Sequence, residues 1–370
     1  MSLNKHFQDV LHISKARSGW IQFVVYGSYF TIALPAGWYI QKFGYKKGIL
    51  LGLWIFGAGA LSFIPAEFIG SFSFYLIALT IIGAGLTFLE TAANPYITTL
   101  GSTETAASRL NLAQAFNGLG WIVGPLAGGL LVFKSDGSSG HIGPAYLILA
   151  VIVLSFSFII SRTSFQDIAE SETKAGLDIQ ESKIQIPFWF GWLALFLYVG
   201  AQTGVNSFFI HYVTESDVTL TSRDAVWLLS FGAMGLFMMG RLAGSFLMSR
   251  YNAYLIFVYF AIMSALIAGL LPYMQGSNSV VCIVSLYFFK SIMFPTIFSF
   301  SLEHTDKIKS KTSSYLIMAI LGGALTPPLM GYLGEQKMSD GFLIPFLCYI
   351  FIAVYAIRMY RSYLKISHGK

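Results

Sequence analysis

The sequence predicts an all-α membrane protein built from two pseudo-repeated bundles of helices. Of the 370 residues, 55% are hydrophobic and only 11% are charged, whereas a soluble domain carries about 25% charged residues. The hydrophobic residues form long runs separated by short polar segments. Short glycine- and proline-containing motifs also recur about 200 residues apart, which is typical of transporters built from repeated halves.

Eleven apolar runs are long enough to cross a bilayer, which takes about 20 helical residues. They cover residues 20–40, 48–66, 72–100, 110–133, 144–161, 188–213, 225–247, 254–274, 280–301, 313–333 and 342–360. One long polar stretch divides five of these spans from the other six. We therefore expect an N-terminal bundle over residues 1–161, a cytoplasmic linker over 162–187 and a C-terminal bundle over 188–370.

The lysines and arginines of the loops predict the orientation. If the loop QKFGYKK at 41–47 is cytoplasmic and the sides alternate, fifteen basic residues fall on the cytoplasmic side and six on the other. This asymmetry follows the positive-inside rule for membrane proteins.

Several function classes are excluded. The net charge of +6 does not indicate nucleic-acid binding, because the basic residues stand between apolar runs rather than on a basic face with interleaved aromatics. No phosphate-binding loop, no metal-ligand spacing and no serine-nucleophile motif is present. We therefore expect neither an enzyme nor a metal site, and no cofactor beyond a proton gradient as the energy source.

The repeat indicates that one helix is missing from the first half. Pro95 in NPYIT matches Pro295 in FPTIF, and the glycines and proline of GWIVGPLAG match those of GALTPPLMG. The second half begins near residue 188, so the same offset places its partner before Met1. Either the chain lacks a first helix that the architecture expects, through a late start or a truncation, or it is a natural protein of eleven spans.

Glu90 is the strongest candidate for chemistry, because it lies in the middle of an apolar span. A carboxyl group at membrane depth is costly and is usually functional, and a proton symporter needs a group that loads and releases protons. Asn94 lies one helical turn away on the same face. Pro95 removes a helix hydrogen bond and leaves the carbonyl of Thr91 without its usual partner. The alternatives are a carboxyl that only links helices and a plain helix kink.

Amide side chains line one face of the next span, where Asn111, Gln114, Asn117 and Trp121 are spaced by three or four residues. An amide can donate and accept at neighbouring sugar hydroxyls, and an indole can stack on the apolar face of a sugar. The alternative is that the amides hold helices together.

In the second half, Tyr198, Gln202 and Asn206 step by four along one helix and would face the same cavity. Lys290 stands five residues before Pro295, as Glu90 stands five before Pro95. Lys290 therefore binds the sugar or pairs with Glu90, or it extends to the interface with no role at the site.

Arg241, in MGRLAG, lies in the cytoplasmic half of its span. We interpret it as a gating or structural residue rather than a sugar ligand.

The stretches LETAANPYITTLG, RLNLAQAFNGLG, YVGAQTGVNSFFIHY, FPTIFSF and LGGALTPPLMG resemble the fucose:proton symporter family, a branch of the major facilitator superfamily. The resemblance covers residues 3 to 360. It implies the major facilitator fold, with twelve helices in two bundles that open alternately to either side, and transport of L-fucose, glucose, galactose or a related sugar. It also implies proton coupling by Glu90 and sugar binding by Gln114 and Asn117. The resemblance in YVGAQT supports the assignment of Tyr198, Gln202 and Asn206 to the cavity. The family carries an acidic residue near the outer end of its first helix, and Met1 falls about where that residue should be. The resemblance therefore leaves open whether this chain couples transport to protons.

The sequence thus predicts a multi-pass, monomeric protein of the bacterial cytoplasmic membrane that takes up a monosaccharide with a proton. Its partners would be the sugar, the proton and the lipid bilayer, with no nucleic acid. The alternatives are a passive uniporter and a truncated relative that binds sugar as a sensor without transport.

Overall fold

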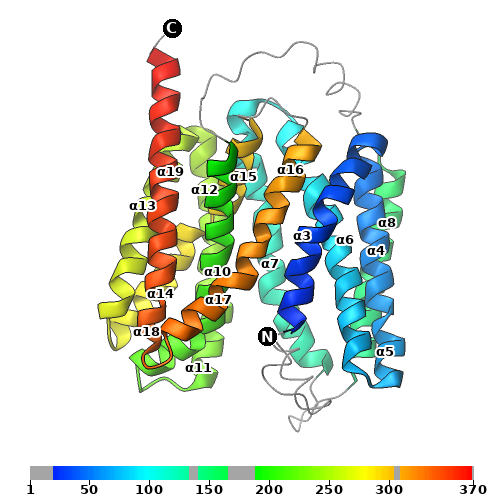
Figure 1. Ribbon diagram of the computed structural model, residues 1–370, viewed down its shortest axis with the longest axis horizontal. Helices are drawn as coiled ribbons and strands as arrows, with labels where there is room; N and C mark the ends of the chain where they lie inside the picture. The colour runs from blue at the N-terminus through cyan, green and yellow to red at the C-terminus, as the bar shows by residue number, and fades with distance from the viewer. Residues whose placement is uncertain (1–19, 133–140, 166–187, 304–308, 369–370) are drawn as a thin grey trace. The chain divides into compact units, whose positions relative to one another are not determined.

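The computed structural model of the chain describes residues 20–132, 141–165, 188–303 and 309–368, and every regular element in these residues is helical (Figure 1). The elements from the first half of the sequence are α3 (Trp20–Phe43), α4 (Tyr45–Leu61), α5 (Phe63–Ile69), α6 (Phe72–Thr99), η1 (Thr103–Thr105), α7 (Ala106–Val132) and α8 (Gly143–Arg162).

The elements from the second half are more fragmented. They are α10 (Phe188–Ser216), α11 (Ser222–Trp227), η2 (Leu228–Ala233), α12 (Met234–Arg250), α13 (Ala253–Leu270), η3 (Leu271–Tyr273), α14 (Ser277–Lys290), α15 (Met293–Glu303), α16 (Lys309–Met318), η4 (Ala319–Leu321), α17 (Gly322–Leu333), α18 (Met338–Gly341) and α19 (Leu343–His368).

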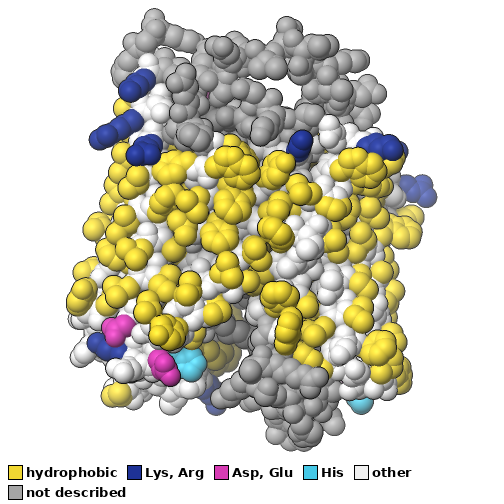
Figure 2. All heavy atoms as spheres, viewed as in Figure 1, with side chains coloured by type: hydrophobic (Ala, Val, Ile, Leu, Met, Phe, Trp, Pro, Cys, Tyr) yellow, Lys and Arg dark blue, Asp and Glu magenta, His cyan; other side chains and the backbone are white. Residues whose placement is uncertain are grey.

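Ten helical segments of the described residues are long and apolar enough to cross a membrane. Each of them overlaps one of the predicted spans, and the remaining predicted span, 110–133, corresponds to the helix α7. Hydrophobic side chains cover most of the visible surface along the helices, and lysine and arginine side chains stand near helix ends (Figure 2). The predicted all-α, multi-pass membrane fold is confirmed.

Several of the spans are interrupted helices, which hydropathy alone did not predict, among them the spans over 277–303 and 309–333. The span over 277–303 consists of α14 and α15, separated by a turn at Ser291 and Ile292. Pro295 is the third residue of α15, where its missing N–H is tolerated because first-turn donors have no partner within a helix. In the span over 309–333, the short 3-10 helix η4 separates α16 from α17.

The chain forms two compact units. The first comprises the described residues within 1–96, 123–178 and 308–318, and the second those within 97–122, 179–307 and 319–370. Each unit therefore contains helical segments from both halves of the sequence. The predicted boundary between two bundles at 162–187 stays a prediction, since most of that segment lies outside the described residues.

In the first unit, glycines bring α4 and α6 into backbone contact. A Cβ at Gly85 would lie 2.5 Å from the amide nitrogen of Phe56 and 2.8 Å from the carbonyl oxygen of Gly52. A Cβ at Gly59 would lie 2.7 Å from the amide nitrogen of Ile82. Small residues are the usual means by which helices approach closely in a bilayer. This packing fixes the position of α6, the helix that carries Glu90.

In the second unit, α10 packs against α17 by the same device. A Cβ at Gly322 would overlap the carbonyl oxygen of Phe196, and one at Gly200 would overlap the hydroxyl oxygen of Thr326. Large side chains such as Tyr198 fill the core beside this contact and are fully buried.

Candidate functional site

The predicted carboxyl and amide of the first unit form a hydrogen-bonded pair on α6. The side-chain nitrogen of Asn94 donates to Oε2 of Glu90 at 2.5 Å, as their spacing of four predicts. Asn94 is buried, whereas Glu90 is half-buried. Tyr29 of α3 lies close enough to Glu90 for an electrostatic interaction between the phenol and the carboxyl. The carboxyl group of this unit is thus held beside both an amide and a phenol.

The carbonyl that Pro95 deprives of its helix partner has acquired another donor. The hydroxyl of Ser313, on α16, donates to the carbonyl oxygen of Thr91 at 3.1 Å, and both residues are buried. α16 packs along α3 in the same unit, where a Cβ at Gly37 would overlap the hydroxyl oxygen of Ser314. Pro95 therefore leaves the carbonyl of Thr91 able to accept a hydrogen bond from Ser313, which belongs to the second half of the sequence.

The predicted cation of the second unit is fully buried. Nζ of Lys290 donates to Oδ1 of Asn206 at 3.1 Å and lies 3.5 Å from the centre of the Tyr287 ring. Lys290 is the last residue of α14, directly before the turn that separates it from α15. The spacing of Tyr198, Gln202 and Asn206 predicts one polar face of α10. Asn206, the last of these three residues, contacts Lys290.

Tyr287, which lies against this lysine, belongs to a group of three buried tyrosines. The hydroxyls of Tyr198 on α10, Tyr287 on α14 and Tyr349 on α19 have no hydrogen-bond partner among the described residues. Tyr349 interacts electrostatically with both Tyr198 and Tyr287, which places the three side chains in one neighbourhood. Gln202 and Asn206 are only half-buried, so the polar face of α10 is more accessible than the lysine behind it.

The amides of α7 belong to a second polar group of this unit, around Arg241. Nδ2 of Asn117 donates to Oε1 of Gln114 at 3.1 Å. The guanidinium of Arg241 donates to the backbone carbonyl of Gln114 and, at 3.2 Å through Nε, to the carbonyl of Ser291. It also stacks on the ring of Phe237. Arg241 thus joins α7, α12 and the turn after α14, and its gating or structural role stays a prediction.

Asn111 makes contacts of the kind that hold helices together. Its Nδ2 donates to the carbonyl of Ala107 at 2.9 Å and to the hydroxyl of Thr296 at 3.1 Å. The neighbouring turn of α7 is tied to α12 by Ser108 and Ser245, each of whose hydroxyls donates to the other's carbonyl. For Asn111 the structure favours the packing alternative over sugar binding.

The side chain of Trp121 lies outside the described part of the chain, although its backbone is within α7. Its predicted stacking on a sugar stays a prediction. So do the roles of the other candidate residues.

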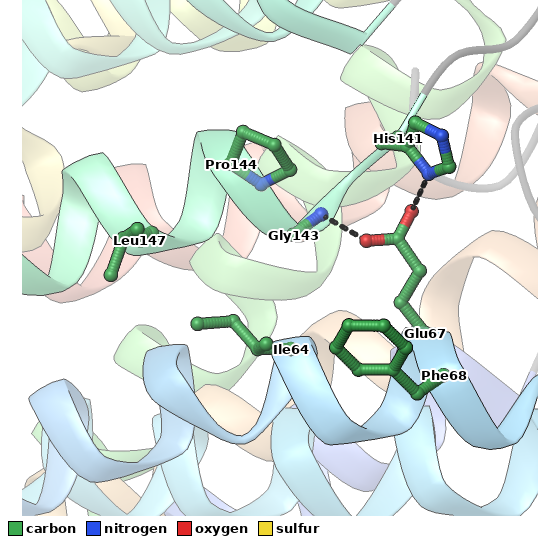
Figure 3. Close-up of a pocket in the computed structure, with 7 residues that line it drawn as sticks. All are labelled: Ile64, Glu67, Phe68, His141, Gly143, Pro144 and Leu147. Carbon is green, nitrogen blue, oxygen red and sulfur yellow. Dashed lines mark hydrogen bonds and ion pairs between the residues drawn. The ribbon is translucent and has the colours of Figure 1, made fainter.

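A cavity of about 550 Å³ lies elsewhere in the first unit and contains none of the predicted site residues (Figure 3). The carboxylate of Glu67 accepts the backbone N–H groups of Ile142 and Gly143 at 3.0 and 2.9 Å, and Nδ1 of His141 lies 3.0 Å from it. The lining residues are Ile64, Glu67, Phe68, His141, Gly143, Pro144 and Leu147. Because these N–H groups are at the start of α8, Glu67 acts as a helix cap from a neighbouring helix.

Sequence reasoning missed several neighbours of the candidate residues. Tyr287 precedes Lys290 by three residues, a spacing that places both on one helical face, so this signal was available. Tyr29, Ser313 and Tyr349 come from helices far away in the sequence, and no local pattern connects them to the site.

Comparisons with known proteins agree with this architecture. The sequence model of the Major Facilitator Superfamily matches residues 1–327. A glucose/galactose transporter of Brucella abortus is 33% identical, over 95% of this chain and 87% of that protein. The L-fucose-proton symporter of Escherichia coli K12 is 32% identical, over 95% of this chain and 86% of that protein.

A solved structure is also similar. A crystal structure of the E. coli fucose:proton symporter, FucP, superposes with a TM-score of 0.78 at 31% identity and covers 96% of this chain and 95% of that one. These relatives are transporters rather than enzymes. The ten candidate membrane-spanning segments of the described residues and the matches over most of the chain lead to one conclusion: the protein belongs to the Major Facilitator Superfamily, within its fucose:proton symporter family.

Proposed function

We propose that this protein takes up a monosaccharide of the L-fucose, galactose or glucose type together with a proton, by alternating access. It would act as a monomer in the cytoplasmic membrane of a bacterium. The names of the relatives, a glucose/galactose transporter and an L-fucose-proton symporter, support the cargo and the coupling ion.

The observation that carries the proposal is the carboxyl group of Glu90. It is half-buried in an apolar helix, and Asn94 donates a hydrogen bond to one of its oxygens. An ionised carboxyl can only accept hydrogen bonds, whereas a protonated one also donates. Taking up a proton therefore changes what Glu90 can bind while the bond from Asn94 still holds it in place. A sugar hydroxyl is a partner that can respond to this change.

The amides provide the sugar contacts in this proposal. Gln114 and Asn117 are linked to each other on α7, and Gln202 presents a second amide on α10. Each amide offers two donors and one acceptor oxygen, which matches adjacent hydroxyls on a neutral sugar. Lys290, Asn206 and Trp121 would complete the binding set.

The test uses membrane vesicles that contain the full chain in a weakly buffered medium. Adding L-fucose, D-galactose or D-glucose to separate samples is expected to make the external medium more alkaline with at least one sugar. Glu90→Gln should abolish this pH change and the accumulation of labelled sugar. Glu104→Gln, which removes an exposed carboxylate outside the membrane spans, is the matched control and should behave as wild type.

Each other result contradicts part of the proposal. Downhill sugar entry with no pH change would indicate a uniporter. Sugar binding without entry would indicate a sensor. Retained alkalinisation in Glu90→Gln would remove Glu90 as the proton carrier.

A further inference from the structure

The buried lysine of the second unit has no countercharge within the described part of the chain. Nζ of Lys290 has three hydrogens to donate, but Oδ1 of Asn206 is the one described acceptor, and the Tyr287 ring covers Nζ on one side. No carboxylate of the described residues lies within ion-pair distance of it or acts on it electrostatically. A fully buried ammonium normally has an ionic partner, because removing the charge from water is unfavourable.

Its position at the end of α14 compensates the charge only in part. Lys290 is the last residue of that helix, where the backbone carbonyls present a partial negative charge. That partial charge is about half of one elementary charge. A chain that needed only packing here would be served by a methionine of similar length.

The tyrosine beside the lysine is also short of an acceptor. The hydroxyl of Tyr287 is buried, finds no hydrogen-bond partner in the residues that the structure describes, and can donate a proton. Lys290 and Tyr287 therefore combine a cation with an unused O–H donor. A neutral sugar hydroxyl both donates and accepts, whereas a carboxylate only accepts and carries the missing charge.

We propose that Lys290 binds the carboxylate of an acidic monosaccharide, so that the cargo of this transporter includes hexuronates. These sugars have the ring of glucose or galactose with a carboxylate at C6. The ring hydroxyls would contact the amide face of α10, which Gln202 and Asn206 leave partly accessible, and the carboxylate would replace Asn206 at the lysine or join it. This inference rests on the proposed monosaccharide uptake and narrows its substrate class.

An electrical consequence follows from the charges. A neutral sugar that enters with one proton moves one positive charge across the membrane. A hexuronate anion that enters with one proton moves no net charge. Uptake of D-galacturonate should therefore respond little to an imposed membrane potential, whereas uptake of D-galactose by the same vesicles should be accelerated by a negative interior.

The experiment compares D-galacturonate with D-galactose, which differ only at C6. In vesicles with the full chain, each sugar is measured as a labelled substrate and as a competitor. Lys290→Met is expected to lower the preference for galacturonate over galactose by about ten- to a hundredfold, the usual effect of losing a hydrogen bond to a charged group. Lys311→Met removes an exposed lysine of α16 and should leave this ratio unchanged.

A second variant keeps the lysine and tests its charge. Asn206→Asp places a carboxylate at the position that now holds the amide oxygen, 3.1 Å from Nζ. This internal partner should compete with the sugar carboxylate and lower the same preference, again by about tenfold or more. Because asparagine and aspartate side chains have nearly the same shape, Asn206→Asp also tests the inference if Lys290→Met does not fold.

Two results overturn the inference. One is transport of galactose by wild type while galacturonate is neither transported nor competes, which would leave the proposed function intact. The other is an unchanged preference in a folded Lys290→Met or Asn206→Asp variant. Failure of every sugar in the wild-type vesicles would instead contradict the proposed function itself.

Discussion

Gly85 offers a sharp test of how α6 is positioned. The methyl group that Gly85→Ala introduces would stand 2.5 Å from the amide nitrogen of Phe56 and 2.8 Å from the carbonyl oxygen of Gly52. Non-bonded carbon contacts prefer about 3.5–4.0 Å, so α4 and α6 would have to separate by about 1 Å. The atoms in the way are backbone atoms of a helix, which cannot rotate aside as a side chain can.

The expected magnitude comes from two opposing effects. Overpacking of this kind destabilises by about 1–3 kcal/mol. Replacing a helical glycine by alanine recovers about 0.5–1 kcal/mol of backbone entropy. We therefore expect Gly85→Ala to lower the free energy of unfolding by about 1–2 kcal/mol. Gly27→Ala is the matched control, because a Cβ at Gly27 on α3 meets no atom within 4 Å, and it should be neutral or slightly stabilising.

The assay is equilibrium unfolding of the purified chain in mixed detergent micelles, followed by tryptophan fluorescence. Gly85→Ala is expected to lower the free energy of unfolding, and Gly27→Ala to leave it unchanged or raise it slightly. If Gly85→Ala is as stable as wild type, or if both variants shift in the same direction, the close contact of α4 and α6 is wrong. Sugar transport by the Gly85→Ala variant is a second readout, because Glu90 lies five residues beyond Gly85 on the same helix.

Two further predictions concern single hydrogen-bonded groups. Ser313→Ala should destabilise by about 0.5–1.5 kcal/mol by the same unfolding assay, because the carbonyl of Thr91 loses its donor. The effect should shrink in a Pro95→Ala background, where the restored N–H can bond that carbonyl, and an undiminished effect would contradict this explanation. Hydrogen bonds from Thr219 hold the pKa of Asp217 below its usual 3.8. Asp217 therefore stabilises the fold above that pKa, and the stability is lost as the pH falls through the lower folded-state value. The thermal midpoint of wild type should fall more between about pH 5 and pH 3 than that of Asp217→Asn, and parallel curves would exclude the linkage.

The fold could largely be predicted from hydropathy and length. Each predicted span overlaps a helix of the described residues. The breaks at 291–292 and 319–321 could not be predicted this way, because an interrupted span has the same hydropathy as a continuous one. Pro295 was visible, but a proline alone does not distinguish a kink from a break, as the uninterrupted α6 around Pro95 demonstrates.

Local spacing predicted contacts within a helix and missed contacts between helices. The spacing of four correctly placed Asn94 against Glu90, because both belong to one helix. The same reasoning put Tyr198 and Asn206 on one face of α10 but could not identify Tyr349 as a neighbour. Partners of this second kind depend on helix packing, which a single sequence does not encode in any short pattern.

The repeated prolines show how one shared feature has acquired different chemistry in the two halves. Pro95 deprives the carbonyl four residues before it of a helix hydrogen bond, whereas Pro295 lies in the first turn of α15 and the carbonyl four residues before it belongs to the preceding turn. In one half this carbonyl, of Thr91, accepts the hydroxyl of Ser313, and in the other the carbonyl of Ser291 accepts the guanidinium of Arg241. The acceptor is thus common to both repeats, while its donor is neutral in one and charged in the other. The same divergence holds five residues before each proline, where one half carries a carboxyl group and the other an ammonium group.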